Sequence, residues 1–299
     1  MMTHVLRRKA RWLWHGLRIR GLNVNAGWNR ERSGHHQGWK QGVMALGGVM
    51  AMLMMTGALA ACRAPRQEAL LVSVAANLRP VIEEITPQIE ESLGAPVSYN
   101  VGASGKLAQQ IEQGAPVDVF LSASPHEVDA LIAQGLLDPA SKQVFARGRL
   151  ILWTRDPALP LSGLDDLARP DIRRIAIANP EHAPYGMAAR EALQNAGLWQ
   201  TLQPKLILGE NVTQSYQYAD TGNVDVAIIP LSLVAVEREG RWVDVPANLY
   251  APLEHTAAIV RNTANRSAAR QFISLLISPA GQAVLVRRGY ALPAEVASP

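Results

Sequence analysis

The chain has 299 residues, enough for one large domain or two of medium size, and it contains a single cysteine. Its formal net charge is +4, but the charge is unevenly distributed. The first 61 residues hold nine Lys or Arg and one acid, and taking these from the totals of 29 and 25 leaves 20 basic and 24 acidic residues. A body with this acidic balance lacks the electrostatic footprint of a nucleic-acid-binding protein, so we expect no nucleic-acid partner.

Residues 1–61 have the composition of a signal peptide. A basic stretch ends at Lys40, and an uncharged run rich in Met, Leu, Val and Ala extends from Gly42 to Ala61. About 20 apolar residues can also span a bilayer, so an uncleaved transmembrane anchor is the alternative. The glycines and the small residues at the end of the run favour cleavage and export. Residues 1–40 are long for the basic part of a signal, which leaves the true start codon open.

The apolar run ends in Leu59-Ala-Ala-Cys62, which resembles the lipobox of bacterial lipoproteins. In a lipobox the cysteine becomes the lipidated first residue of the mature protein. The alternative is an ordinary buried thiol, but Cys62 is the only cysteine and directly follows small residues. We therefore expect residues 62–69 to form a tether, with a lipid anchor holding the body on the periplasmic face of a membrane. Whether that is the inner or the outer membrane stays open.

The body of the chain alternates short apolar, β-branched runs with amphipathic helical stretches. This pattern is typical of an α/β protein with mainly parallel sheets. In chain order, strands are predicted at residues 70–74, 96–101, 117–121, 150–153, 175–178, 224–229 and 257–260. Helices are predicted at residues 79–93, 107–113, 125–134, 187–196, 212–220, 266–277 and 279–288.

The pattern restarts after Arg149 without an obvious linker. We therefore expect two α/β lobes, with a chain that crosses between them more than once. Lobe 1 is predicted to contain residues 70–148 and 254–299, and lobe 2 residues 149–253. Small-molecule sites favour clefts between such lobes.

Four loops follow a strand or precede a helix, where ligands gather in open α/β sheets. The loop Gly102-Ala-Ser104-Gly-Lys106 superficially suggests a P-loop or a nucleophile elbow. Its spacing fits neither, because Asn100 replaces the first P-loop glycine and Lys106 replaces the last elbow glycine. What remains is a hydroxyl and free N–H groups at a helix start, an arrangement that binds anions. The alternative is that Ser104 only caps its helix.

The loop sequences together resemble those of the periplasmic molybdate-binding proteins of ABC importers. The resemblance covers Leu70 to Pro293 and rests on five segments in the same order and spacing: Ala75-Ala-Asn-Leu78, Gly102-Ala-Ser-Gly105, Gly114-Ala-Pro-Val-Asp-Val-Phe-Leu-Ser-Ala123, Asn179-Pro-Glu-His-Ala-Pro-Tyr-Gly186 and Gly209-Glu-Asn-Val-Thr-Gln214. It implies a type II periplasmic-binding fold with a tetrahedral oxyanion in the cleft. It further implies a monomeric, cofactor-free, non-enzymatic protein that delivers molybdate, and also tungstate, to a membrane permease complex.

The resemblance also implies which residues bind the anion. Ser104 would give its hydroxyl and its N–H, and Asn77 its N–H together with its amide. Tyr185 and Val212 would donate backbone N–H groups from the other lobe. Many members carry a tyrosine where this chain has Pro230, so the Tyr185 hydroxyl or Asn77 would have to replace that contact.

The chemistry of the four residues agrees with a dianionic ligand. A fully ionised dianion needs only donors, and none of the four is an acid. Phosphate is partly protonated near neutral pH and would need an acceptor in the site. Sulfate or another tetrahedral oxyanion remains the alternative ligand, because sequence does not give the size of the pocket.

Other function classes find less support. A serine hydrolase with Ser104 as nucleophile and His182 as base is the distant alternative, and it lacks an orienting acid at any recognisable spacing. His126, His182 and His255 have no metal-ligand spacing, so we expect no site for a free metal cation. A cytoplasmic regulator would need a DNA-binding helix pair in the place that the leader occupies.

Overall fold

The protein was analysed as a computed structural model, which describes residues 69–236 and 239–293. Cys62, the signal peptide and the tether lie outside these residues, so their predicted roles stay predictions. Within the described part, no single helix has both the length and the apolar composition to cross a membrane.

The first sheet contains β1 (Leu70–Ala75), β2 (Val97–Gly102), β3 (Val119–Ser122), β4 (Gln143–Arg147) and β10 (Glu254–Ile259), in the order β2-β1-β3-β10-β4. Strands β1, β2 and β3 are parallel, and β10 runs antiparallel to both β3 and β4. The parallel strands therefore end at one edge of the sheet, where the loops after β1, β2 and β3 meet.

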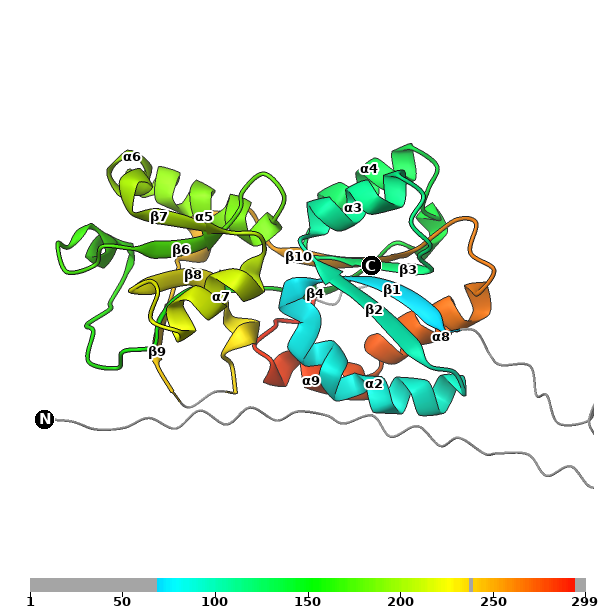
Figure 1. The fold of residues 1–299 in the computed structure, drawn as a ribbon. Helices are drawn as coiled ribbons and strands as arrows, with labels where there is room; N and C mark the ends of the chain where they lie inside the picture. Colours follow the sequence, from blue (N-terminus) through cyan, green and yellow to red (C-terminus); the bar gives the residue numbers. More distant parts are fainter. Residues whose placement is uncertain (1–68, 237–238, 294–299) are drawn as a thin grey trace, which may run out of the picture. The chain divides into compact units, whose positions relative to one another are not determined.

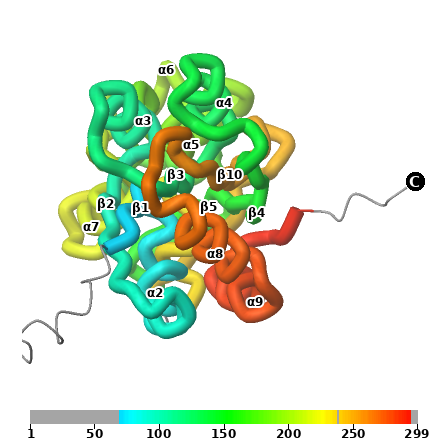
Figure 2. The backbone as a smooth tube through the Cα atoms, turned by 90° about the vertical axis from the view of Figure 1, so that its right-hand side faces the viewer, coloured from blue at the N-terminus to red at the C-terminus, as the bar shows by residue number. Residues whose placement is uncertain are grey.

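Helices cover both faces of the first sheet. Figures 1 and 2 show α3 (Ser104–Glu112) and α4 (Pro125–Ala133) on one face, with α2 (Arg79–Leu93), α8 (Arg266–Leu276) and α9 (Pro279–Arg287) on the other. Helix α2 buries its apolar side chains at helical spacing and ends at Gly94, whose φ of 64° is the left-handed conformation of a helix cap.

The second sheet contains β5 (Leu150–Thr154), β6 (Ile175–Ala178), β7 (Leu206–Gly209), β8 (Val226–Pro230) and β9 (Arg241–Asp244), in the order β7-β6-β8-β5-β9. Strands β6, β7 and β8 are parallel, whereas β5 is antiparallel to β8 and β9. Helices α5 (Pro184–Asn195) and α7 (Val212–Asp220) lie on opposite faces of it (Figure 1), and α6 (Trp199–Leu202) follows α5.

The described residues also form short 3-10 helices: η1 (Ala76–Leu78), η2 (Pro139–Ser141), η3 (Leu164–Ala168), η4 (Gln203–Lys205), η5 (Leu231–Leu233) and η6 (Ala247–Leu249). The chain passes from the first sheet to the second between β4 and β5, at Gly148 and Arg149, and returns between β9 and β10. One continuous apolar core includes buried residues of both sheets, among them Leu121 and Ile177. Two α/β lobes joined in this way match the predicted fold class.

Three features differ from the sequence-based expectation. Each sheet is mixed, with two antiparallel pairings beside two parallel ones. The short strands β4, β7 and β9 were not predicted. Their residues are partly exposed, and the apolar run of β7, Leu206 to Leu208, is short. Helices α3 and α5 begin three residues earlier than predicted, which places Ser104 and Tyr185 in first helical turns.

Candidate functional site

One small pocket brings together the four residues that the sequence singled out. Asn77, Ser104, Tyr185 and Val212 all line it, and small apolar residues such as Ala103 and Ala183 complete its wall. The cavity between the lining residues has a volume of about 10 Å³. This is far below the roughly 300–1,000 Å³ typical of pockets for drug-sized ligands, so the lining residues enclose the space closely.

Ser104 begins α3 directly after β2. Its residue is 1% exposed, and its hydroxyl oxygen accepts a hydrogen bond from the Ala123 N–H at 3.0 Å. Because the oxygen is held as an acceptor, the hydroxyl hydrogen is free to donate. The Ser104 N–H lies in the first helical turn, where backbone N–H groups have no partner within the helix.

Two further helix starts supply backbone donors. Helix α7 begins at Val212, and the Asn211 side chain before it accepts from the N–H groups of Thr213 and Gln214 at 3.0 and 3.1 Å. This capping leaves the Val212 N–H for a ligand. In α5 the first residue is Pro184, which has no N–H, so Tyr185 carries the first backbone donor of that helix. Three helix starts thus direct N–H groups and positive dipole ends at one pocket.

The Tyr185 hydroxyl lies away from these donors. Its oxygen is buried without a hydrogen-bond partner among the described residues. It packs on Gly148, where a Cβ would stand 1.8 Å from it, and the ring lies 6.0 Å from the His255 ring. Neither Gly148 nor His255 lines the pocket. Burial raises the pKa of the Tyr185 phenol well above its usual value, so the group stays protonated.

The Asn77 amide is also engaged elsewhere. Its Nδ2 lies 2.6 Å from His255 Nε2 and 2.7 Å from the Tyr290 hydroxyl. Its backbone carbonyl accepts from Ser232 Oγ and from the same tyrosine hydroxyl, each at 2.9 Å. Sequence reasoning missed Ser232 and Tyr290 and gave His255 only a structural or surface role. No motif marks these three residues, and the histidine is fully buried.

Among the residues that the structure describes, no carboxylate lines the pocket. Glu210 is close in sequence to Val212, but it forms an ion pair with Lys106 at 2.7 Å. The hydrogen bond from Lys106 lowers the pKa of Glu210, so this carboxylate stays ionised and paired. The pocket therefore offers donors to a ligand and no acidic side chain.

The two lobes touch beside the pocket. The Gly105 N–H donates to the His182 carbonyl at 2.9 Å, and the Lys106–Glu210 ion pair lies next to it. A Cβ on Gly105 would stand 2.9 Å from that carbonyl oxygen, so this approach requires glycine. His182 enters this contact through its backbone. No hydrogen bond joins its ring to Ser104 within residues 69–236 and 239–293, so the catalytic pair of the hydrolase alternative is not formed.

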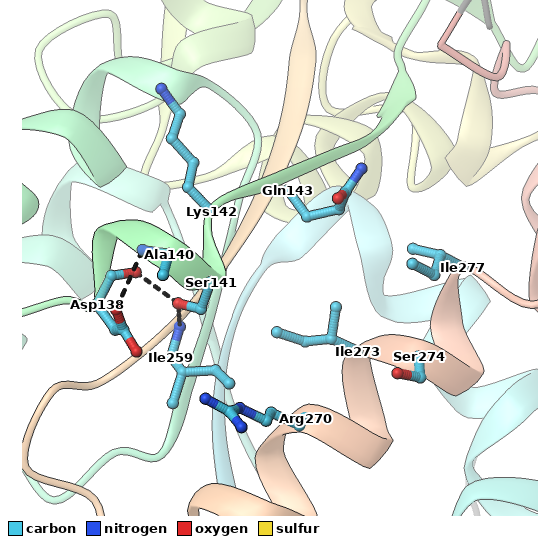
Figure 3. A pocket seen from close by; sticks show the side chains of 10 residues that line it. All are labelled: Asp138, Ala140, Ser141, Lys142, Gln143, Ile259, Arg270, Ile273, Ser274 and Ile277. Atoms are coloured by element: carbon cyan, nitrogen blue, oxygen red, sulfur yellow. Dashed lines mark hydrogen bonds between the residues drawn. The ribbon is translucent and has the colours of Figure 1, made fainter.

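A second pocket lies on the first lobe between η2, β4 and α8 (Figure 3). Three of its polar side chains, those of Asp138, Ser141 and Lys142, have hydrogen-bond or ion-pair partners. Asp138 pairs with Arg266 at 2.6 Å, and the Ser141 hydroxyl accepts from the Ile259 N–H while donating to the Asp138 carbonyl. Across the described residues no group of three or more His, Cys, Asp or Glu side chains gathers. Because the carboxylate of Asp138 lines this second pocket, whereas no acid is among the described residues that line the pocket at the three helix starts, the latter is the better candidate for an anion.

Comparison with known proteins agrees with this geometry. A family model described as "Bacterial extracellular solute-binding protein" matches residues 70–291. The molybdate-binding protein ModA of Rhodobacter capsulatus is 36% identical over 223 residues, which are 74% of this chain and 87% of that protein. ModA of Azotobacter vinelandii is 32% identical over 241 residues, covering 78% and 94%.

The solved structure of the Azotobacter vinelandii periplasmic molybdate-binding protein has the same arrangement of lobes. It matches with a TM-score of 0.72 and 33% identity, over 75% of this chain and 99% of that one. The family resemblance predicted from the loops is thereby confirmed. The chain belongs to the bacterial extracellular solute-binding protein family and has its type II periplasmic-binding fold.

Proposed function

We propose that this protein captures molybdate as the substrate-binding component of an ABC importer. The observation that carries the proposal is the convergence of the Ser104 hydroxyl and three helix-start N–H groups on one small pocket without a lining carboxylate. Relatives named molybdate-binding proteins, at 36% and 32% identity, support molybdate as the ligand. Lobe closure over the anion would be the signal that the permease reads.

Hydrogen bonds to a single small dianion can supply the required affinity. Each bond to a charged partner contributes about 1.5–3 kcal/mol. The proposed donors are Ser104, through its hydroxyl and N–H, and the N–H groups of Asn77, Tyr185 and Val212. Since these groups are held in place before binding, little of this energy is spent on ordering them. We therefore expect micromolar to nanomolar affinity, about −8 to −12 kcal/mol.

The proposal also covers the location of the protein, its partner and its second ligand. We place the body on the periplasmic face, attached through a lipidated Cys62, where it acts as a monomer and delivers the anion to a membrane permease complex. Tungstate is a second ligand, because it has the same charge and tetrahedral shape. No cofactor, metal cation or catalytic residue takes part.

Calorimetric titration tests the ligand. The soluble body, residues 66–299, is titrated separately with molybdate, tungstate, sulfate and phosphate. We expect tight binding of molybdate and tungstate, far weaker binding of sulfate, and negligible binding of phosphate, whose proton finds no acceptor in the pocket. Tight sulfate binding would assign the protein to another oxyanion, and an absence of molybdate binding would overturn the proposed function.

A further inference from the structure

Asn77 lies at the centre of a buried group that we call the Asn77 network: Asn77, Ser232, His255 and Tyr290. The four residues are at most 4% exposed. Asn77 lines the pocket, whereas Ser232, His255 and Tyr290 do not. The network therefore connects a pocket residue to parts of the chain that cannot touch a ligand directly.

The hydrogen bonds fix the orientation of the Asn77 amide. His255 Nδ1 lies 3.2 Å from the Leu253 carbonyl, which can only accept, so Nδ1 carries the ring hydrogen. Burial lowers the pKa of His255 to about 3, so the ring is neutral and its Nε2 is an acceptor. One amide hydrogen of Asn77 thus goes to Nε2 at 2.6 Å and the other to the Tyr290 oxygen at 2.7 Å. Neither amide hydrogen is left for a ligand.

The backbone of Asn77 is held from the other side. Its carbonyl accepts from the Tyr290 hydroxyl and from Ser232 Oγ, each at 2.9 Å. Tyr290 therefore accepts from the side chain and donates to the backbone of the same residue. With the carbonyl and the side chain both fixed, η1 has one orientation in which to present its N–H groups to the pocket.

The partners come from distant parts of the fold. Tyr290 precedes Ala291, which exchanges backbone hydrogen bonds of 2.7 and 2.9 Å with Arg147, next to the first crossover. His255 lies at the start of β10, directly after the second crossover, whereas Ser232 follows β8 of the second sheet. The Ser232–Asn77 bond therefore joins the two lobes at the pocket.

We propose that Tyr290, His255 and Ser232 are positioning residues of the anion site. They hold Asn77 so that its backbone N–H, and not its amide, faces the bound oxyanion. Ser232 adds a bond that exists only when the lobes are together, so it slows release of the ligand. This inference rests on the proposed function, because it concerns the same pocket.

Calorimetry with molybdate on the whole soluble body tests the role of Tyr290. Tyr290→Phe removes the hydroxyl that both accepts from and donates to Asn77, and we expect roughly tenfold weaker affinity, the effect of one buried hydrogen-bonded group. Tyr99→Phe is the matched control. Its hydroxyl bonds Thr86 at 2.8 Å outside the pocket, so its affinity should equal that of the wild type.

A double-mutant cycle separates positioning from general packing. If Tyr290 acts partly through the Asn77 amide, the double variant Asn77→Ala/Tyr290→Phe loses less affinity than the sum of the two single losses, and the remaining effect of Tyr290→Phe comes from the bond to the backbone carbonyl, which Asn77→Ala retains. A merely structural tyrosine would give additive losses, and additivity would overturn the proposal. Thermal unfolding checks that each variant is folded.

Ser232→Ala provides a second, independent readout that does not depend on the folding of the Tyr290 variant. We expect molybdate to leave several-fold faster in stopped-flow displacement, with the Tm of the ligand-free protein unchanged, because the carbonyl keeps its bond from Tyr290. An unchanged release rate would contradict the role of Ser232. A wild-type protein that fails to bind molybdate would overturn the proposed function, whereas wild-type affinity in both variants would overturn only this inference.

Discussion

At the scale of single residues, the site depends on which atom of each side chain or backbone faces the pocket. The sequence predicted the four pocket residues, and the structure brings all four together. It could not predict the orientation of Asn77, because its partners His255 and Tyr290 are 178 and 213 residues away in the chain. The sequence could not predict the packing of the Tyr185 phenol on Gly148 either, because the two residues lie far apart in the chain and Gly148 belongs to the crossover between the lobes.

Tyr185→Phe tests which part of this tyrosine contributes. We expect molybdate affinity within a factor of about two of the wild type, since the backbone N–H is retained and the hydroxyl lies outside the pocket. The Tm should stay equal or rise, because the substitution removes a buried hydroxyl that has no partner among the described residues. A loss of affinity approaching tenfold would mean that the hydroxyl reaches the anion and replaces the tyrosine absent at Pro230.

At the scale of elements, the starts of α3, α5 and α7 create the site. Apolar periodicity predicted α2, and Asn211 as a capping residue predicted the start of α7, whereas α3 and α5 were predicted to begin three residues late. Their first turns, Ser104-Gly-Lys and Pro184-Tyr-Gly, carry glycines and polar groups and give no helical pattern. Apolar periodicity could not mark these two turns, although the Tyr185 side chain is buried in the core.

Val212→Pro tests a backbone donor directly. Proline is well tolerated at the first position of a helix, and Asn211 already has the extended conformation, φ −149° and ψ 179°, that precedes proline. The variant should therefore fold while losing one N–H donor, with molybdate affinity weakened roughly ten- to hundredfold. Val212→Ala keeps the N–H and should bind like the wild type. Calorimetry measures the molybdate affinity of both variants, and thermal unfolding checks that each is folded. Equal affinity of the two variants would mean that the Val212 N–H does not bind the anion.

At the scale of the whole molecule, the chain builds the first sheet in two passes, β1 to β4 and then β10, and the second sheet in one pass, β5 to β9. From the sequence, the restart of the pattern after Arg149 led us to expect more than one crossing between lobes. The sequence could not predict the contacts between lobes, such as Gly105 with His182 or Lys106 with Glu210, because they depend on how the two sheets meet. The edge strand β9 escaped prediction because its residues are largely exposed and polar.

The proposed membrane anchor concerns residues that precede the described part of the chain. If Leu59-Ala-Ala-Cys62 is a lipobox, growth with a tagged fatty acid should label the wild type and leave Cys62→Ser unlabelled. Both proteins should be compared at equal expression by immunoblotting. Equal labelling of the two would refute lipidation at this cysteine, and an unlabelled wild type would favour either a cleaved signal without lipid or a transmembrane anchor.

We proposed that the pocket at the three helix starts binds molybdate through fixed donors. Ser104→Ala is the sharpest test, because Ser104 is the only serine or threonine among the described residues that line this pocket, and the substitution leaves every backbone N–H in place. Ser274→Ala, an exposed serine on α8, is the matched control. In calorimetric titration with molybdate we expect Ser104→Ala to bind roughly ten- to hundredfold more weakly than the control, the effect of one hydrogen bond to a charged partner. Wild-type affinity in a folded Ser104→Ala protein would mean that the anion binds elsewhere.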